Sequence, residues 1–303
     1  MKYDIIGVGD TVLDHLYTTE SFPEENGNAH ILSIRDEGGG VVGTSVFAAA
    51  HLGSKTAVIT LLGHDEDGKS IAAGLEKEGI DISGIRYIPD KHSPVSYILV
   101  NILNGSRTIL PYRDKFPPVP FDFVHRDMIQ NAKILHLDTV NFENSLNAAR
   151  IMKEAGGLVS VDACSVHEEP EAYEELWKYT DILIANEAFP ARVARRASLS
   201  ENLRYFASFG PSVVITTLGE KGCVLLNHGE LHAFPAYRVD VRDTTGAGDV
   251  FHGAFLHRYA RNDSVESCIR FASAAAALKC TRPGGRSGIP TEEEVFRFLE
   301  TVG

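Results

Sequence analysis

The sequence predicts an α/β protein whose core is a doubly wound, mainly parallel β-sheet. Short β-branched segments, several of them continuously apolar, alternate with segments of helical periodicity for most of the chain. This alternation is typical of βαβ units, and strands that are apolar throughout are typical of a parallel sheet covered by helices on both faces. Two segments, 11–37 and 94–112, have strand patterns that interrupt the alternation.

The expected strands and helices follow one another along the chain. Strands are expected at seven segments: 3–9, 56–62, 134–138, 158–163, 181–186, 212–217 and 223–227. Helices are expected at 41–52, 68–78, 144–155 and 171–179. The first three helices each end just before a glycine (Gly53, Gly79 and Gly156), which is a typical helix stop.

The two interrupting segments have a different arrangement. Residues 94–112 predict a hairpin, because Asn104-Gly105 is a strong two-residue turn signal, and residues 30–34 predict another strand. Together they either form a small sheet that covers a site and excludes water, or extend an edge of the main sheet. No linker-like change of composition divides the chain, so we expect one domain over residues 1–303, with lid segments at about 11–37 and 92–115.

Composition argues against several classes of protein. The chain has 303 residues and a net charge of −12, so a broad basic surface for nucleic acid is not expected. Its four cysteines lack metal-ligand spacing, which favours free thiols in a reducing cytoplasm. The N-terminal segment has the pattern of a strand rather than of a signal peptide, and no apolar stretch is long enough to span a membrane. We therefore expect a cytoplasmic protein that acts on a small molecule.

One short motif matches a nucleotide-binding pattern, but the acidic residues within it argue against phosphate binding. Residues 63–70, GHDEDGKS, match the P-loop pattern G-x-x-x-x-G-K-[ST]. The carboxylates of Asp65, Glu66 and Asp67 would stand inside the phosphate cradle and repel the ligand. A P-loop also follows the first buried strand, whereas this segment follows a later one. We expect a solvated turn in which Asp67 caps a helix beginning near Gly68, and a nucleotide site elsewhere.

The segment 242–260 contains the residues that we expect to bind an anion and to act in catalysis. Gly246, Ala247 and Gly248 precede a helical pattern, so their N–H groups would lie at a helix N-terminus, where anions bind. Asp249 follows in the first turn. It is either a carboxylate favoured there by the helix dipole, or a general base beside an anion site, which is the arrangement that phosphoryl transfer requires.

Two long signatures carry a resemblance to a known family. The segment DTTGAGDVFHGAF (243–255) resembles the C-terminal signature of the ribokinase, or PfkB-type, carbohydrate kinases, and residues 37–68 resemble the N-terminal one. The resemblance spans nearly the whole chain. Within the family, residues 38–44 and 278–290 look like the sulfofructose kinase branch, and NGSRTI (104–109) looks like ketohexokinase-like members.

The resemblance implies a three-layer α/β fold with a β-sheet lid, and ATP-dependent phosphorylation of a sugar hydroxyl. Asp249 would be the general base, and the N–H groups of Gly246, Ala247 and Gly248 the anion hole. The implied acceptor-binding residues are Asp14, Gly39, Gly40, Thr44 and Arg107. The implied nucleotide-binding residues are Asn186, Thr217, Gly219, Gly222, Ser273 and Gly285. A monovalent cation such as K⁺ would be held at Asp243, Thr245, Arg282 and Gly284.

Two positions depart from the family pattern. Thr44 stands where the family usually has an Asn that binds the sugar, so a different hydroxyl pattern is expected there. The N-x-x-E motif, whose Glu helps to organise Mg²⁺, begins at Asn186 but ends in Phe189, and Glu187 is the nearest substitute. The handling of Mg²⁺ is therefore open.

Three functions remain open from the sequence. The first is a sugar kinase using Mg·ATP on a ketose, pentose or sugar acid, with Arg113 and Lys115 available for a carboxylate or phosphate. The second is a nucleoside kinase, for which Tyr97 and Tyr112 of the lid could stack on a base. The third is a sugar-binding sensor without catalysis. A homodimer that pairs its lids edge to edge is also expected.

Overall fold

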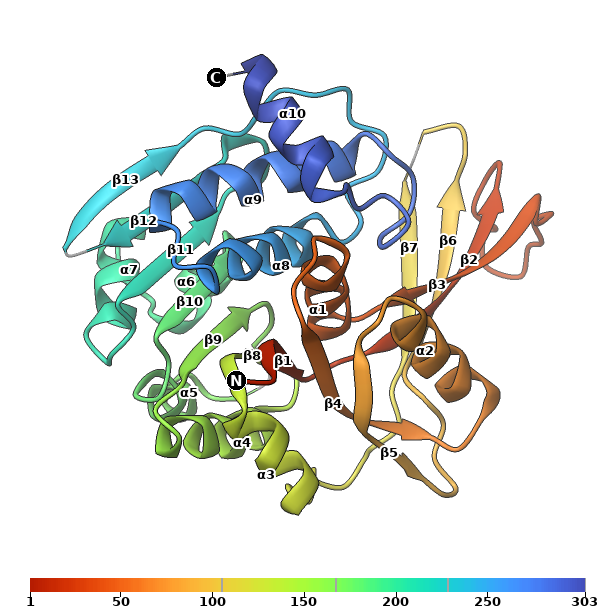
Figure 1. The fold of residues 1–303 in the computed structure, drawn as a ribbon. Helices are drawn as coiled ribbons and strands as arrows, with labels where there is room; N and C mark the ends of the chain where they lie inside the picture. Colours follow the sequence, from red (N-terminus) through yellow and green to blue (C-terminus); the bar gives the residue numbers. More distant parts are fainter. Residues whose placement is uncertain (105, 167, 228, 303) are drawn as a thin grey trace.

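The computed structural model describes residues 1–104, 106–166, 168–227 and 229–302 (Figure 1). Its main sheet has nine strands in the order β13-β12-β11-β10-β9-β8-β1-β4-β5. The strands from β5 to β11 run parallel, and β12 and β13 continue the sheet antiparallel. Their bounds are β1 Tyr3–Val8, β4 Thr56–Gly63, β5 Asp81–Ile88, β8 Ala132–Asp138, β9 Leu158–Ala163, β10 Ile182–Asn186, β11 Val213–Thr217, β12 Cys223–Asn227 and β13 Glu230–Phe234.

Helices cover both faces of the main sheet, giving three layers (Figure 1). Successive strand residues point to opposite faces: Ile6 and Leu135 pack with α3 to α7, whereas Ile5 and Ile134 pack with α1, α8, α9 and α10. The helices are α1 Val41–His51, α2 Glu66–Lys77, α3 Phe123–Gln130, α4 Phe142–Glu154, α5 Pro170–Trp177, α6 Ala188–Val193, α7 Leu199–Ala207, α8 Ala247–Tyr259, α9 Val265–Cys280 and α10 Glu292–Val302. The doubly wound α/β prediction is confirmed, because continuously apolar strands are buried on both sides.

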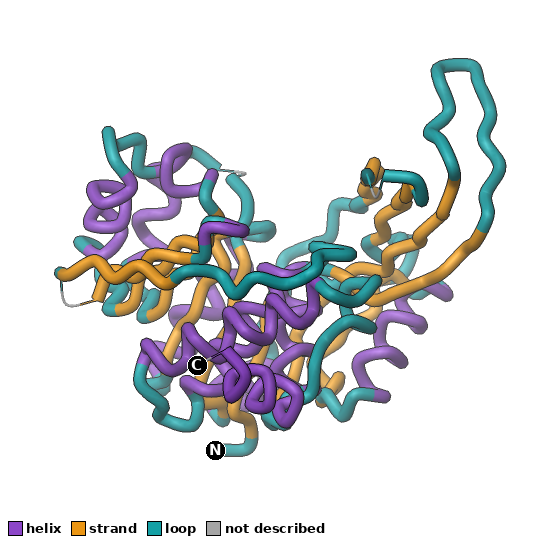
Figure 2. The backbone as a smooth tube through the Cα atoms, turned by 90° about the horizontal axis from the view of Figure 1, so that it is seen from above, coloured by secondary structure: helices purple, strands orange, loops and turns teal. Residues whose placement is uncertain are grey.

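A second sheet of four strands stands beside the first, in the order β3-β2-β6-β7 (Figures 1 and 2). Its strands are β2 Val12–Thr19, β3 Ser33–Gly39, β6 Val95–Asn101 and β7 Arg107–Tyr112. The interrupting segments therefore form a separate lid sheet and do not extend the main one. The hairpin joins β6 to β7 as expected, although Gly105 of its expected turn lies outside the described residues.

Three local predictions are wrong or incomplete. The strand expected at 30–34 lies at Ser33–Gly39, because it is fixed by pairing with β2 rather than by apolar burial. Helix α2 begins at Glu66, and Asp65, not Asp67, is its N-cap: the Asp65 side chain accepts the Gly68 N–H at 2.8 Å. Strands β2, β5 and β13 and helices α3, α6, α7, α9 and α10 were not among the expected elements.

Candidate active site

The expected catalytic residues lie at the carboxyl ends of the parallel strands, between the main sheet and the lid. Helix α8 begins there after Gly246, which has a φ of 71° and serves as the N-cap. Gly248 is exposed, and a Cβ at this position would meet open space, so the backbone can be approached closely. The Ala247 N–H donates to the Thr244 carbonyl at 3.2 Å, so this expected anion-hole donor is engaged in the turn.

The carboxyl group of Asp249 lies among other charges. Its pKa is raised to about 7: burial raises it most, the positive charge of Arg286 lowers it, and the nearby carboxylates of Asp14, Asp10 and Asp138 add to the rise. A carboxyl group with a pKa near neutrality can accept a proton under ordinary conditions. Asp249 is therefore suited to act as a general base.

Asp14 rests directly on the backbone that joins the lid to α1. It lies on β2, and burial raises the pKa of its carboxyl group. A Cβ at Gly39 would stand 2.4 Å from Asp14 Oδ2, so only glycine allows the carboxylate to approach. Gly40 has a φ of 87° and is the N-cap of α1, where a Cβ would meet the Asp10 carbonyl oxygen at 2.5 Å. Both glycines are required by this geometry.

Thr44 lies against the beginning of α8. Its side chain is only 2% exposed, and its Cγ2 atom lies 3.5 Å from where a Gly246 Cβ would be. The Cα of Gly285 lies 3.6 Å, and Asp249 Oδ2 3.7 Å, from the same point. Three segments that are distant in sequence therefore meet at the expected anion hole.

Arg286 is a buried cation at the candidate site that the sequence did not lead us to expect. It is 7% exposed, and its Nη2 donates to the Gly39 carbonyl at 2.7 Å. The guanidinium lies over the ring of Phe47, at 5.2 Å from the centroid, and it fills the space that a Cβ at Gly38 or Gly43 would need. Burial lowers its pKa to about 10, so it remains a cation near Asp14 and Asp249. The glycines at 38–43 were the only sequence signal that a large side chain packs closely against this segment.

Four of the expected nucleotide-binding residues, Asn186, Thr217, Gly219 and Gly222, lie at or just after the ends of β10 and β11, whereas Ser273 and Gly285 come from other parts of the fold. Asn186 and Thr217 are register partners at the ends of β10 and β11. The Asn186 side chain donates to the Cys164 carbonyl at 2.8 Å, and its oxygen accepts the N–H groups of Ala188 and Phe189, the first two residues of α6. Gly219 and Gly222 both have positive φ, and a Cβ at Gly222 would collide with the Phe234 carbonyl. Ser273 lies within α9, and Gly285 donates to Glu37 Oε2 at 3.1 Å.

The loops expected to hold a monovalent cation are closely bonded to one another. Asp243 Oδ1 accepts the Thr245 N–H at 2.8 Å, and Oδ2 accepts the Gly284 N–H at 2.8 Å. Arg282 instead pairs with Glu294 of α10. Arg107, expected at the acceptor, reaches from the lid to Asp243, with 3.4 Å between Nη1 and Oδ1.

The Mg²⁺ residue implied by the family pattern does not fit this structure. Phe189, at the motif's Glu position, is buried among the rings of Tyr173 and Trp177. Glu187 is largely exposed, and its Oε1 lies 3.8 Å from Lys221 Nζ. Among the described residues there is no group of three or more His, Cys, Asp or Glu placed to hold a metal ion.

A buried polar cluster that the sequence did not predict lies between the main sheet and α8. Asp138 and Asp162 are register partners on β8 and β9, and His252 of α8 places Nε2 3.3 Å from Asp162 Oδ2. Burial raises the pKa of Asp162, as does the charge of Asp249, and burial lowers the pKa of His252. Burial thus disfavours the charged forms of both Asp162 and His252.

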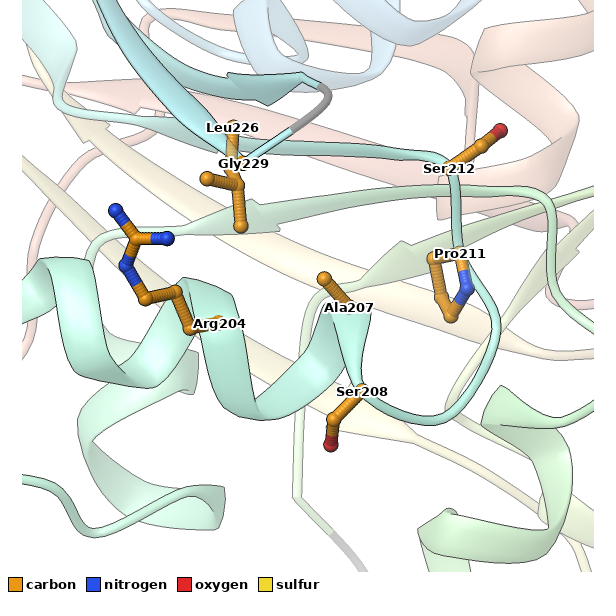
Figure 3. A pocket seen from close by; sticks show the side chains of 7 residues that line it. All are labelled: Arg204, Ala207, Ser208, Pro211, Ser212, Leu226 and Gly229. Carbon is orange, nitrogen blue, oxygen red and sulfur yellow. The ribbon is translucent and has the colours of Figure 1, made fainter.

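A cavity of about 400 Å³ adjoins Asp10. Its lining includes Arg113, Asp114 and Lys115 on one side and Asn141 and Glu143 on the other. Arg113 Nη2 lies 3.6 Å from Asp10 Oδ2. Another cavity, of about 410 Å³, lies at the amino end of β11 beside α7 (Figure 3). Neither cavity is lined by an expected catalytic, acceptor-binding or nucleotide-binding residue, but Arg113 and Lys115, named above for an acidic acceptor, line the first one.

Comparison with known proteins gives a consistent result. A family model described as pfkB family carbohydrate kinase matches residues 2–292. An ATP-dependent ribose-1-phosphate kinase of Halopiger xanaduensis is 29% identical, over 97% of each chain. A nucleoside kinase of Methanothermobacter thermautotrophicus is 26% identical, over 99% of this chain and 97% of its own. The solved structure of Arabidopsis thaliana ribokinase complexed with ribose and ATP superposes with a TM-score of 0.89 at 25% identity, covering 99% of each chain.

Proposed function

Since the chain belongs to the pfkB family of carbohydrate kinases, we propose that it transfers the γ-phosphoryl group of ATP to a hydroxyl of a ketose, pentose or sugar acid. It is a phosphotransferase with an alcohol group as acceptor. The observation that carries the finer proposal is the carboxyl group of Asp249, whose pKa is raised to about 7, in the first turn of α8 beside the exposed Gly248.

Asp249 accepts the proton of the acceptor hydroxyl in this proposal. The hydroxyl oxygen then forms a bond to the γ-phosphorus as the bond from that phosphorus to the β-phosphate oxygen of ATP breaks. Charge on the transferring group lies at the N-terminus of α8, where the helix dipole and the N–H groups of Gly246 and Gly248 stabilise it. Mg·ATP is the substrate form we assign.

Asp14, with Gly39 and Gly40 beneath it, is the acceptor-binding group. A carboxylate can accept hydrogen bonds from two sugar hydroxyls, and the glycines allow the substrate to approach the backbone. Thr44 contributes a single hydroxyl group from α1, and Arg107 contributes from the lid by joining it to Asp243. Asn186, Thr217, Gly219, Gly222, Ser273 and Gly285 would border the nucleotide.

The acceptor that we propose first has an acidic end. Arg113 and Lys115 would pair with its carboxylate or phosphate; they line the cavity beside Asp10 together with the acidic residues Asp10, Asp114 and Glu143. A nucleoside remains the alternative, since one relative is named a nucleoside kinase. Tyr97 of the lid, however, already stacks on His15 at 5.3 Å, and Tyr112 contacts His92 edge-on at 6.0 Å. The acidic acceptor is therefore our first candidate, and the sensor hypothesis is set aside because the family consists of kinases.

The test is ADP release from Mg·ATP with a panel of ketoses, pentoses, sugar acids, sugar phosphates and nucleosides. The Asp249→Asn variant should lose about 10²–10⁴-fold in rate, as expected for a missing general base. Asp127→Asn, which changes an exposed carboxylate on α3, is the matched control and should keep full activity. Equal activity of Asp249→Asn and the native chain would refute the assigned base, and preference for a nucleoside would refute the assigned acceptor.

We also propose that the protein acts in the cytoplasm, as one domain, and as a homodimer through its lids. The lid's edge strands β3 and β7 carry exposed apolar side chains, Ile34 at 67% and Ile109 at 52%. Covering them would remove an exposed sheet edge. The four cysteines are free thiols, and none of the helices in the described part of the chain is long and apolar enough to cross a membrane. A monomer in sedimentation at micromolar concentration would refute the dimer.

A further inference from the structure

The loops expected to bind a monovalent cation already contain a positive charge supplied by the protein. Lys279, in the last turn of α9, has no exposed surface. Its Nζ donates to the Asp243 carbonyl oxygen at 2.8 Å and lies 4.0 Å from Asp243 Oδ1. Burying a lysine is unfavourable unless its ammonium group is paired and hydrogen-bonded, so this placement is specific.

The surrounding residues are those to which the sequence assigned the cation. Asp243 is bonded to Thr245 and to Gly284, and the Arg282 N–H donates to the Lys279 carbonyl at 3.0 Å. Gly288 completes the enclosure: a Cβ there would lie 3.3 Å from Lys279 Cε. A larger residue at 288 would press on the lysine stem, whereas glycine leaves it room.

A potassium ion and an alkylammonium group carry the same charge and are both coordinated by carbonyl and carboxylate oxygens. The oxygens of Asp243 therefore cannot serve both in the same place. Arg107 adds a further positive charge at 3.4 Å from Asp243 Oδ1. The Asp243 carboxylate thus already faces two cationic side chains, and their positive charges would repel a further cation.

We propose that the buried ammonium group of Lys279 takes the place of a monovalent cation in this protein. It holds the loop at 243–245 against the loop at 282–288, and so fixes the turn from which α8 begins. The inference rests on the proposed kinase function, because that turn is the assigned anion hole. If the ammonium group of Lys279 replaces the cation, the reaction does not require K⁺.

The test compares melting temperatures of the whole chain in potassium, ammonium, sodium and tetramethylammonium chloride at equal ionic strength. The native chain should melt at the same temperature in all four salts. Lys279→Ala should melt lower, because it leaves the Asp243 carbonyl group without its partner. It should regain stability with K⁺ or NH₄⁺, but not with the bulky tetramethylammonium ion, since a small ion can then bind the vacated space.

Two further variants keep the test decisive. Lys279→Met retains most of the stem's volume without the charge, so it should melt lower in every salt. Lys133→Ala, which removes a half-exposed lysine paired with Asp4, should show no new salt response. A K⁺-specific rise in the native chain, a K⁺ response shared by Lys279→Met, or no response in a folded Lys279→Ala would each overturn the proposal. If Lys279→Ala does not fold, the native chain and Lys279→Met decide.

Melting temperature needs no acceptor, so this experiment can succeed even if the proposed function fails. Where an acceptor has been found, ADP release gives a second measurement. The native rate should be unchanged when K⁺ is replaced by tetramethylammonium. A large loss of rate on this replacement would overturn the proposal but would leave the assignment of Asp249 intact.

Discussion

The side chain of Arg286 is hydrogen-bonded to the backbone of Gly39, 247 residues earlier in the chain, with 2.7 Å between Nη2 and the carbonyl oxygen. The same Gly39 lies under the carboxylate of Asp14. One buried cation therefore supports the backbone beneath the carboxylate proposed to bind the acceptor, and it lowers the pKa of the proposed base, Asp249. We expect Arg286 to act through these groups as a positioning residue.

The activity of the native enzyme should fall as the pH drops through about 7. Asp249 accepts a proton only in its ionised form, which prevails above its pKa, and burial raises that pKa to about 7. The dependence of kcat/KM on pH, measured from ADP release between about pH 5.5 and 9, should therefore show an acidic limb near neutrality. A profile that is flat down to the ordinary range of an aspartate would contradict the prediction.

Replacing Arg286 should move that limb to higher pH. The guanidinium group lowers the pKa of Asp249, so Arg286→Gln should raise this pKa, by about one unit or more for the loss of a nearby opposite charge. Arg286→Lys keeps the charge and should retain more of the native profile, although it loses the planar contact with Phe47. An unshifted limb in Arg286→Gln, with reduced stability alone, would show a purely structural role.

Adding one methyl group at Gly39 should weaken acceptor use. The new Cβ would stand 2.4 Å from Asp14 Oδ2, so the carboxylate must move. We expect Gly39→Ala to lower kcat/KM for the acceptor by roughly 10–100-fold, because small misplacements of a binding group have effects of this size. The KM for ATP should change little.

Gly74→Ala is the matched control for this substitution. Gly74 lies inside α2, where a Cβ would meet open space, so the variant should be stabilised by up to about 1 kcal/mol through helix propensity. Its kinetics should be native. Equal acceptor kinetics for the two variants would show that the contact between Gly39 and Asp14 has no functional role.

Sequence reasoning found the elements that local pattern specifies. Strands β1 and β4 are mostly apolar and buried, and both were predicted. Strand β2 carries Asp14 and is only partly buried, so pairing rather than pattern determines it. Lys279 and Arg286 were missed because each depends on partners far away in sequence, 36 and 247 residues distant. No local spacing encodes such contacts.

Restoring the family's missing Glu should damage the fold rather than improve the enzyme. Phe189, at that position, is 1% exposed, with ring centroids 6.1 Å from Trp177 and 6.2 Å from Phe206. Phe189→Glu would place a carboxyl group without a partner in this aromatic cluster, which destabilises by several kcal/mol. Phe189→Ala should lose about 3–5 kcal/mol, and Phe189→Leu less, because more of the volume is kept. Urea unfolding midpoints measure all three, and a Phe189→Glu variant as stable as the native chain would show that the side chain at 189 can turn outward to the nucleotide.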